Sequence, residues 1–295
     1  MQLSVLIPTY NHACHDLVQS LWEQCDNCAG LQQYEIIVAD DGSTDEASLS
    51  VNRRINALSH CHLVETGRNV GRSRIRRTMV RQMRYPLVLI MDSDAAVVND
   101  HFIENYLKHA TRAQVICGGA TVSAQYARKD NTLRFRNEMA IYRKHTAHYR
   151  NRHTYESFTP FNVMIHKDVF LQVNFDETLS QYGYEDVLFG QALQEKGISI
   201  LHIDNPLIHT GMDSNADYLE KTETALRNLH MLQGRLSGYS PILQAYQRIR
   251  KFRCAHLLRL FHNTFGPSMR KNLMGQHPSL LLFKMYKLGY FACLG

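Results

Sequence analysis

The chain has 295 residues, 44% of them hydrophobic and 20% charged, which suits one large α/β domain or two small ones with a sizeable core. No apolar stretch reaches the ~18 uncharged residues of a membrane-spanning helix, and residues 3–7 are too short for a signal peptide. The seven cysteines, an odd number, form no disulfide framework. We therefore expect a cytoplasmic protein.

The net charge of +6 is distributed unevenly along the chain. Residues 224–295 contain eleven Lys and Arg but no Asp or Glu, so this segment carries +11 and residues 1–223 carry −5. The two parts are therefore expected to have different roles. A basic, partly aromatic segment favours an anionic partner, and a membrane surface and a nucleic acid are the two candidates.

Short apolar runs alternate with helical patterns over the first third of the chain. The uninterrupted apolar run at residues 87–91 is typical of a strand buried on both faces of a sheet. Strands that alternate with helices predict parallel βαβ units. The predicted strands of this part are residues 3–7, 34–39, 62–66 and 87–91, and a strongly basic helix is predicted at residues 72–84.

Acidic side chains follow two of these strands. Asp92 and Asp94 flank Ser93 directly after the fourth strand, and Asp40 and Asp41 follow the second. Ligands of open α/β sheets bind just beyond the carboxyl ends of the strands, so both acidic pairs are expected to face one crevice. Neighbouring carboxylates repel each other unless a positive group lies between them, and a divalent metal carrying a phosphorylated ligand would fill that role. The alternative is a solvated turn, since Asp and Ser are common in turns.

Four short motifs resemble those of the family 2 glycosyltransferases in order and spacing. The resemblance covers roughly residues 1–215 and implies an α/β protein of GT-A fold, with a Rossmann-like, mostly parallel sheet flanked by helices. It further implies transfer of a sugar from a nucleotide-diphosphate donor, with inversion at the anomeric carbon. The motifs are SVLIPTYN at residues 4–11, DDGSTD at 40–45, NVG at 69–71 and DSD at 92–94.

The resemblance implies how the donor is held. Asp40 would accept the imide N–H of a uracil, and Asp41 beside it has a binding or a structural role. Arg74 or Arg76 would reach the phosphates, although Ile75-Arg76-Arg77 departs from the family's Ala-Arg-Asn and a solvated basic helix is the alternative. The residues implied to bind the nucleotide sugar are Pro8, Thr9, Tyr10, Asp40, Asp41, Arg76, Asp92 and Ser93.

The same resemblance implies a metal site. Asp94 and Asp92 would hold Mn²⁺ or Mg²⁺, with Asp94 the more direct ligand. His209 stands where GT-A enzymes complete the site, His202 is the competing candidate, and an imidazole ligand favours Mn²⁺. The cation would neutralise the departing diphosphate as the glycosidic bond breaks. His145, His148 and His153 are expected to be ordinary surface histidines.

A third acidic pair, Glu185 and Asp186, opens a helix predicted to end at Gly197. With Tyr182 and Tyr184 it forms an aromatic-Gly-aromatic-Glu-Asp pattern that resembles galactosyltransferases and chondroitin-polymerase-type enzymes. In those enzymes this Asp is the catalytic base, and a base is needed because the acceptor hydroxyl must lose its proton as it attacks. The resemblance therefore implies catalysis by Asp186, with Glu185 as the near alternative, and sugar stacking by both tyrosines. The structural alternative is that the helix dipole favours acids in a first turn.

We divide the chain into a GT-A domain at residues 1–218 and a helical, basic region at residues 219–295. The domain consists of a nucleotide-binding half, residues 1–98, and an acceptor half, residues 99–218. The basic region mixes apolar and cationic residues as interfacial helices do, which predicts contact with anionic lipid. Packing on the catalytic domain or on another subunit is the alternative, and no nucleic acid is expected, because no nucleic-acid motif accompanies the segment.

Together with these features, the resemblance implies an inverting, metal-dependent hexosyl- or N-acetylhexosaminyltransferase. Its donor would be a UDP-sugar and its acceptor a glycan or a lipid-linked sugar in polysaccharide biosynthesis, at the inner face of the membrane. A sugar-nucleotide pyrophosphorylase-like fold is disfavoured, because Pro8-Thr-Tyr-Asn-His is not the Gly-rich loop that it needs. An inactive nucleotide-sugar-binding partner with a membrane-binding tail is the alternative, and the retained carboxylates argue against it.

Overall fold

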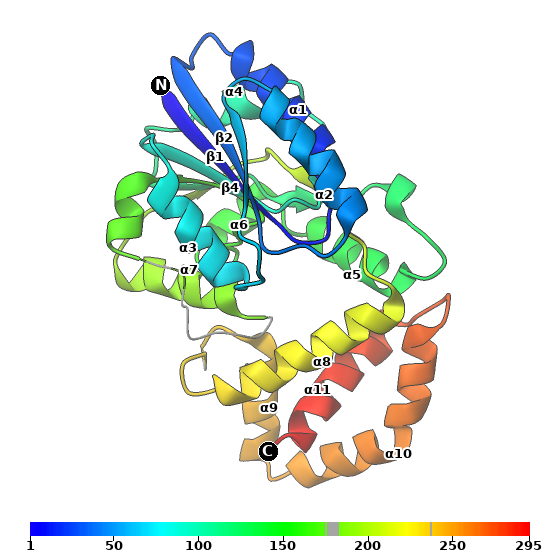
Figure 1. Ribbon diagram of the computed structural model, residues 1–295. Coiled ribbons are helices and arrows are strands. Elements are labelled where there is room, and N and C mark those ends of the chain that lie inside the picture. Colours follow the sequence, from blue (N-terminus) through cyan, green and yellow to red (C-terminus); the bar gives the residue numbers. More distant parts are fainter. Residues whose placement is uncertain (174, 176–182, 237) are drawn as a thin grey trace. The chain divides into compact units, whose positions relative to one another are not determined.

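The structure is a computed structural model that describes residues 1–295 except 174, 176–182 and 237 (Figure 1). The chain forms two compact units, each built from three separate stretches of sequence. The first unit comprises Met1–Thr121, Lys144–Thr178 and Phe189–Gly211, and the second comprises Val122–Arg143, Leu179–Leu188 and Met212–Gly295.

A seven-stranded sheet with the order β3-β2-β1-β4-β8-β6-β9 forms the centre of the first unit (Figure 1). Strands β3, β2, β1 and β4 are parallel, which confirms the predicted βαβ units. Strand β8 is antiparallel to both of its neighbours, and β9 is parallel to β6. The strands are β1 Gln2–Thr9, β2 Gln33–Asp40, β3 Cys61–Glu65, β4 Leu87–Met91, β6 Val115–Cys117, β8 Asn162–His166 and β9 Ile200–His202.

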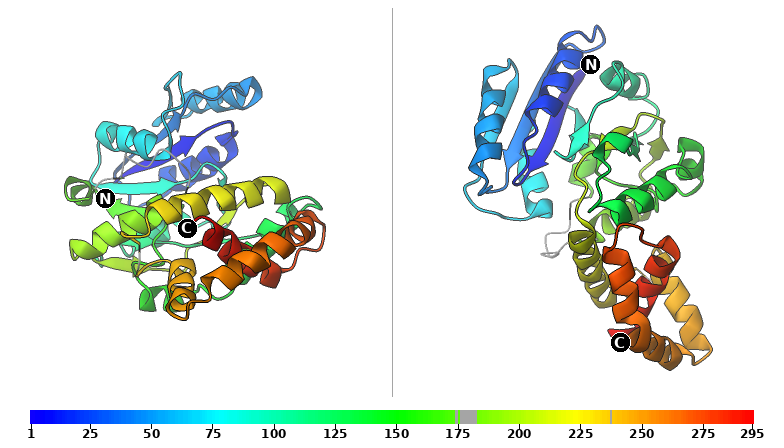
Figure 2. Two further views of the ribbon diagram at one scale, coloured as in Figure 1. Left: turned by 90° about the horizontal axis from the view of Figure 1, so that it is seen from below. Right: turned by 90° about the vertical axis from the view of Figure 1, so that its right-hand side faces the viewer.

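Helices cover both faces of this sheet (Figures 1 and 2). Alternate side chains of a strand point to opposite faces, so neighbours such as Leu89 and Ile90 of β4 belong to different cores. One core includes residues of α1 and α4, and the other includes residues of α3 and the later part of α7. The helices are α1 His15–Asp26, α2 Glu46–Arg53, α3 Arg72–Gln82, α4 Phe102–Leu107, α6 Ala147–Arg152 and α7 Glu185–Glu195, with short 3-10 helices at Arg54–Ala57 and Lys167–Leu171.

A second, three-stranded sheet of the first unit has the order β5-β10-β7. Its strands are β5 Ala95–Ala96, β7 Ala120–Thr121 and β10 Leu207–His209. Strands β5 and β10 are antiparallel, with His209 opposite Ala95, and the Thr210 N–H donates to the Asp94 carbonyl at 2.8 Å. This ladder brings residue 209 beside residue 94, although the two are far apart in the sequence.

The second unit is helical. Its helices α8, α10 and α11 pack on one another, and serine side chains cap α8, α9 and α11 by accepting a backbone N–H of the first turn. Leu133 of α5 joins Leu273 of α10 and Phe283 of α11 in one buried cluster. The elements are α5 Thr132–Tyr142, α8 Asn215–Met231, α9 Pro241–Lys251, α10 Ala255–Met274 and α11 Leu280–Cys293, with a 3-10 helix at Ala124–Tyr126.

Local contacts set the ends of several helices. Ser43 stands three residues before Glu46, the spacing of a capping box, but Asp45 caps α2 by accepting from the Ser48 N–H at 3.2 Å, because Ser43 bonds Asp40 instead. Residues 120–155 contain two separate helices, α5 and α6, and Thr146 is the N-cap of α6. The predicted stop of α7 at Gly197 is confirmed by its φ of 65°.

The boundary predicted after residue 218 falls inside α8, Asn215–Met231. The compact units place residues 122–143 with the C-terminal helices, which a single cut of the sequence could not anticipate. As a division into domains, the boundary at residue 218 stays a prediction.

Candidate active site

The loop after β1 is tied to the loop after β2 by Asn11. The Asn11 side-chain Oδ1 accepts from the backbone N–H groups of Thr44 at 2.7 Å and Asp45 at 3.0 Å. The Asn11 backbone N–H donates to the Ser43 Oγ at 2.7 Å. Asn11 has a φ of 49°, in the left-handed region that Asn tolerates better than most residues. Two of the family-like motifs are therefore one connected structure. Asn11 had no predicted role, although an Asn at a strand end was the available signal.

Asp40 lies at the carboxyl end of β2, opposite Thr9 of β1, as predicted. It is buried, and its carboxylate accepts from both the backbone N–H and the hydroxyl of Ser43, the former at 2.8 Å. Tyr10, in the neighbouring loop, is 48% exposed, so its ring is accessible. The contact of Asp40 with a nucleotide base stays a prediction.

Asp41 has a structural role. Its two carboxylate oxygens accept from the N–H groups of Val70 at 2.7 Å and Gly71 at 2.9 Å, where α3 begins. A negative charge at a helix N-terminus is favourable. Gly42 has a φ of 72°, and a Cβ there would lie 2.3 Å from the Arg68 carbonyl carbon. The Asp41-Gly42 pair thus holds residues 68–71 in place.

Asp92 follows β4 and forms an ion pair with Arg76 of α3. The Arg76 Nη2 lies 2.6 Å from the Asp92 Oδ1, and the Arg76 side chain is 2% exposed. Its guanidinium also lies over the Phe175 ring, 5.6 Å from the ring centroid. Arg76 was predicted to reach the phosphates, and the structure gives it contact with a predicted site carboxylate instead. Its phosphate contact stays a prediction, but its role in orienting Asp92 follows directly from this geometry.

Asp94 pairs with His209. The His209 Nε2 lies 3.1 Å from the Asp94 Oδ2, and the two side chains are 6% and 26% exposed, respectively. The β5–β10 ladder fixes both backbones, and Phe161 packs edge-on against the imidazole at 5.4 Å. His202, the competing candidate, lies in β9 with its Nε2 2.8 Å from the Thr154 carbonyl, and burial lowers its pKa to about 4. Of the two histidines, His209 is therefore the one that contacts Asp94.

The Asp94–His209 pair fits a divalent metal by its chemistry and its spacing. A carboxylate oxygen and an imidazole nitrogen suit Mn²⁺. Two ligands at right angles on metal bonds of about 2.1 Å lie about 3.0 Å apart, and the observed separation is 3.1 Å. A Cβ at residue 211 would lie 2.3 Å from the Asp94 Oδ2, so Gly211 leaves room for the carboxylate.

Within the described part of the chain, no group of three or more His, Cys, Asp or Glu is suited to hold a metal ion. Asp92, predicted as a further ligand, is paired with Arg76. A site with two protein ligands leaves positions for phosphate oxygens, as is usual for Mg²⁺ bound with a phosphorylated substrate.

The Glu185–Asp186 segment belongs to the second unit and begins α7. Gly183 and Tyr184 directly before it have φ values of 109° and 70°, so two consecutive residues are in left-handed conformations. The Glu185 Oε2 accepts from the Gly183 N–H at 2.9 Å, which engages the Glu185 side chain in holding the helix start. Backbone strain of this kind is concentrated at functional sites.

Tyr184 packs against the buried cluster of the helical unit, and burial raises the pKa of its hydroxyl. Its packing gives it a structural role, and its predicted stacking on a sugar stays a prediction. Tyr182, the other residue predicted to stack on a sugar, lies outside the described residues.

Residues 4–173, more than half of the chain, match the family model described as Glycosyl transferase family 2. The chain belongs to this family. An uncharacterized glycosyltransferase of Haemophilus influenzae is 31% identical over 98 residues, which are 33% of this chain and 38% of that protein. The match therefore spans well under half of the curated relative.

Solved structures extend the likeness to the whole fold. S. aureus TarS 1-349 in complex with UDP-GlcNAc superposes with a TM-score of 0.54 at 16% identity, over 99% of this chain and 90% of that one. The mannosyltransferase PcManGT from Pyrobaculum calidifontis, in complex with GDP-Man and Mn²⁺, has a TM-score of 0.50 at 17% identity, over 76% and 61% of the two chains. At these identities the likeness is one of fold, and it confirms the predicted GT-A architecture.

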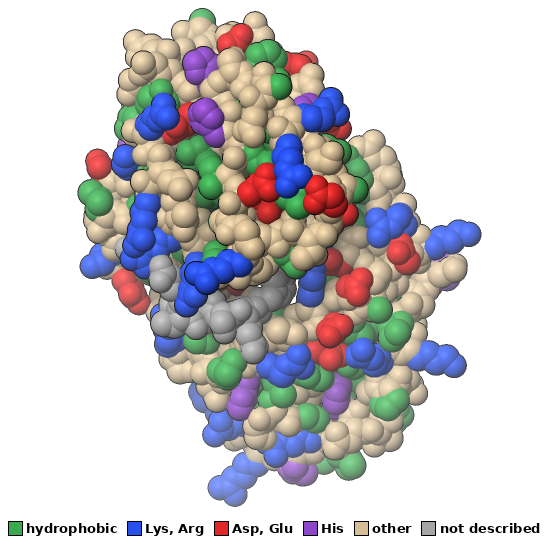
Figure 3. All heavy atoms as spheres, viewed as in Figure 1, with side chains coloured by type: hydrophobic (Ala, Val, Ile, Leu, Met, Phe, Trp, Pro, Cys, Tyr) green, Lys and Arg blue, Asp and Glu red, His purple; other side chains and the backbone are tan. Residues whose placement is uncertain are grey.

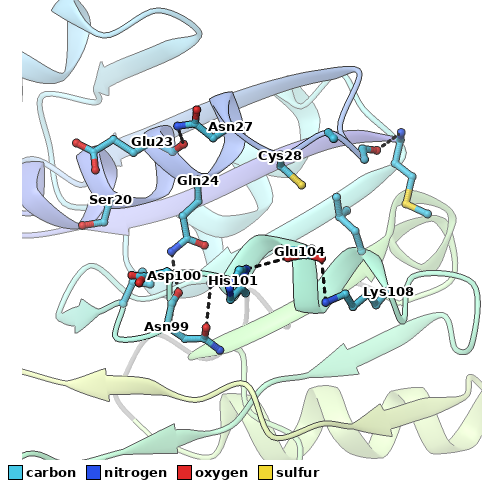
Figure 4. A pocket seen from close by; sticks show the side chains of 15 residues that line it. Ser20, Glu23, Gln24, Asn27, Cys28, Asn99, Asp100, His101, Glu104 and Lys108 are labelled. Atoms are coloured by element: carbon cyan, nitrogen blue, oxygen red, sulfur yellow. Dashed lines mark hydrogen bonds and ion pairs between the residues drawn. The ribbon is translucent and has the colours of Figure 1, made fainter.

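This family 2 glycosyltransferase also has a pocket of about 860 Å³ between α1 and α4 (Figure 4). One of its lining residues is Met1, directly before β1. Asp40 lies at the other end of these parallel strands, at the carboxyl end of β2. The Gln24 side chain crosses the pocket, donating to the Asn99 carbonyl at 2.8 Å and accepting from the Ile103 N–H at 3.1 Å. None of the predicted site residues lines this pocket.

Proposed function

We propose that this protein transfers a hexosyl or N-acetylhexosaminyl group from a UDP-sugar to a hydroxyl of a glycan or lipid-linked acceptor, with inversion. The observation that carries the proposal is the Asp94–His209 pair, whose carboxylate and imidazole groups can bind a divalent metal, next to the Arg76–Asp92 ion pair beyond β4. Two structural neighbours support it, since one is in complex with UDP-GlcNAc and the other with GDP-Man and Mn²⁺. Formation of a polysaccharide or glycolipid is part of the proposal.

The donor base is held by the loops that Asn11 connects. The accessible ring of Tyr10 stacks on the base, with Pro8 and Thr9 beside it. The Asp40 carboxylate accepts an N–H from the pairing edge of the base, which uracil offers at its imide. Asp41 contributes indirectly, by fixing the start of α3. Comparison of UDP with GDP tests this part separately from the sugar.

Asp94 and His209 would hold a divalent cation, Mn²⁺ or Mg²⁺. Such a cation would supply positive charge for the diphosphate leaving group. Asp92, oriented by Arg76, accepts from hydroxyl groups of the donor ribose or sugar, and the backbone of Ser93 lies between the two carboxylates. Arg76 keeps its ion pair throughout, so it acts as a positioning residue.

Asp186 accepts the proton of the acceptor hydroxyl. The acceptor oxygen forms a bond to the anomeric carbon while the bond from that carbon to the diphosphate breaks, and attack from the opposite face inverts the configuration. Asp186 stands where the family resemblance implies the base, and the Glu185 carboxylate accepts from the Gly183 N–H at the start of the helix. Its place in the first turn of α7 holds Asp186 on regular secondary structure.

A screen of nucleotide sugars with the purified chain tests the function. We expect one UDP-sugar to raise the melting temperature and to be hydrolysed slowly, both only with Mn²⁺ or Mg²⁺ present. The Asp94→Asn variant should lose both effects, whereas Asp168→Asn, which removes an exposed carboxylate of the same unit, should keep them. Binding without turnover of any donor or acceptor would instead support the inactive nucleotide-sugar-binding partner.

A further inference from the structure

The helical unit has a sharp corner where α9 ends and α10 begins, at residues 248–260. The two helices are joined only by Phe252, Arg253 and Cys254, and Arg253 reverses the chain with a φ of 57°. We refer to residues 248–260 as the α9–α10 corner. Apart from His256, its exposed side chains are cationic or apolar.

The apolar side chains of the corner are exposed to an unusual degree. Phe252, at the tip, is 80% exposed, and Leu257 and Leu260 on α10 are 54% and 63% exposed. Phe265, further along α10, is 50% exposed. On a helix with 3.6 residues per turn, positions 257, 260 and 265 share the face opposite the buried Gly266 and Leu273. The outward face of α10 is therefore apolar over its first half.

The cations of the corner lie around this apolar tip. Arg248, Arg250, Lys251 and Arg253 are all exposed, and no Asp or Glu occurs between residues 224 and 295. Within the described part of the chain, none of these four cations forms an ion pair with an acidic side chain. Figure 3 shows Lys and Arg side chains gathered over this end of the second unit, next to hydrophobic ones.

An exposed patch that combines large apolar side chains with unpaired cations fits the interface of an anionic bilayer. Apolar groups enter the boundary between headgroups and acyl chains, while Lys and Arg contact the anionic headgroups. Among the described residues, every helix falls short of the length or apolarity needed to cross a bilayer. A corner that rests on the surface is therefore the form of lipid contact that these residues support.

We propose that the α9–α10 corner docks this protein on anionic membranes, with Phe252, Leu257 and Leu260 inserted at the interface. The four surrounding cations select anionic lipid. A polyanion such as RNA would be attracted by the same charges, but it would leave the aliphatic side chains of α10 in water. A second copy of this chain would bring like charges together. The lipid surface alone uses both kinds of side chain.

Co-sedimentation with vesicles tests the proposal and requires no catalytic activity. The full chain is mixed with vesicles of phosphatidylcholine alone or with about one third phosphatidylglycerol, at low and at high salt. We expect binding to the anionic vesicles only, weakened by salt because the charges are exposed. The variant R248Q/R250Q/K251Q/R253Q should bind roughly 10²–10³-fold more weakly, at about fivefold for each cation. Phe252→Ser should weaken binding about tenfold without changing its dependence on salt.

The matched control removes four exposed cations from the other unit, as R54Q/R81Q/R112Q/K196Q, and leaves the same net charge. It should bind vesicles within about twofold of the unaltered chain, less than one cation's share. Equal binding to neutral and anionic vesicles, or equal losses in the two fourfold variants, would overturn the proposal. Binding of single-stranded RNA that Phe252→Ser leaves unchanged, without vesicle binding, would overturn it in favour of a nucleic acid. Thermal melts of the variants confirm that each is folded.

Discussion

The Asp92–Asp94 segment of the first unit and the Glu185–Asp186 segment of the second hold their carboxylates by different means. In the first, the partners come from distant parts of the sequence, namely Arg76 on α3 and His209 on β10. In the second, the Glu185 carboxylate is held locally, since it accepts from the N–H of Gly183 two residues earlier. A site held by distant partners depends on the whole fold, whereas one held locally depends on a few backbone angles.

The largest expected effect tests the chemistry assigned to the second segment. Asp186→Asn should lower turnover by roughly 10²–10⁴-fold, because the amide cannot accept the acceptor proton. Binding of UDP with Mn²⁺, measured by calorimetry, should change little, since Asp94 and His209 are untouched. Glu185→Gln is the matched variant and should retain more activity. Turnover of Asp186→Asn above about a tenth of the unaltered rate would remove Asp186 from the role of base.

The fold was predictable from the sequence where the signal is local. The apolar residues 87–91 predicted β4, because a strand buried on both faces needs an uninterrupted apolar run. The partners of the site residues were less accessible. Arg76 lies in a basic helix that resembled a solvated surface, and only the tertiary structure shows that it is buried beside Asp92.

The choice of His209 over His202 was made on the family resemblance, and its physical reason was not visible in the sequence. That reason depends on the register of β5, which has two residues, and β10, which has three, and strands so short leave no periodic signal. The position of α5 in the helical unit also depends on non-local packing, through Leu133 in the cluster with Phe283.

Removal of Arg76 tests whether the first segment depends on its distant partner. Arg76→Met should lower the free energy of unfolding by about 3–5 kcal/mol, because it leaves a partly buried carboxylate without its counter-ion. Urea denaturation monitored by circular dichroism measures the change. The double variant R76M/D92N should recover part of the loss, since no uncompensated charge remains. If R76M/D92N is no more stable than Arg76→Met, the ion pair does not account for the effect.

The acid sensitivity of the fold separates His202 from His209. Burial lowers the pKa of His202 from 6.5 to about 4, so the unfolded chain binds more protons between these values. The stability contributed by neutral His202 is therefore complete above pH 6.5 and is lost as the pH falls toward 4, by about 3 kcal/mol at most.

Urea titrations at several pH values should show this slope, and His202→Gln, which keeps a donor for the Thr154 carbonyl, should flatten it. Binding of Mn²⁺ with UDP at pH 7.5 should be the same in His202→Gln and the unaltered chain, and about 10–100-fold weaker in His209→Gln. A large loss of metal binding in His202→Gln would show that the assignment of the site's imidazole to His209 is wrong.

Two glycine substitutions give the smallest and most direct comparison of the two segments. A Cβ at residue 211 would lie 2.3 Å from the Asp94 Oδ2, and a Cβ at residue 183 would lie 2.8 Å from the Ala225 Cβ. Gly211→Ala should therefore displace the metal-binding carboxylate and weaken binding of UDP with Mn²⁺ about tenfold. Gly183→Ala should leave that binding unchanged and lower turnover, because strain of about 1–3 kcal/mol at a φ of 109° alters the start of α7.

Gly197→Ala is the control for backbone strain alone, since residue 197 has a φ of 65° and nothing lies within 4 Å of the added Cβ. It should lower stability without the specific loss of either binding or turnover. The two measurements thus separate the variants: Gly211→Ala should weaken binding of UDP with Mn²⁺, whereas Gly183→Ala should lower turnover and leave that binding unchanged. If Gly211→Ala and Gly183→Ala both reduce metal-dependent binding and turnover in the same proportion as Gly197→Ala, general destabilisation explains all three. The distinction between a distantly held and a locally held segment would then be wrong.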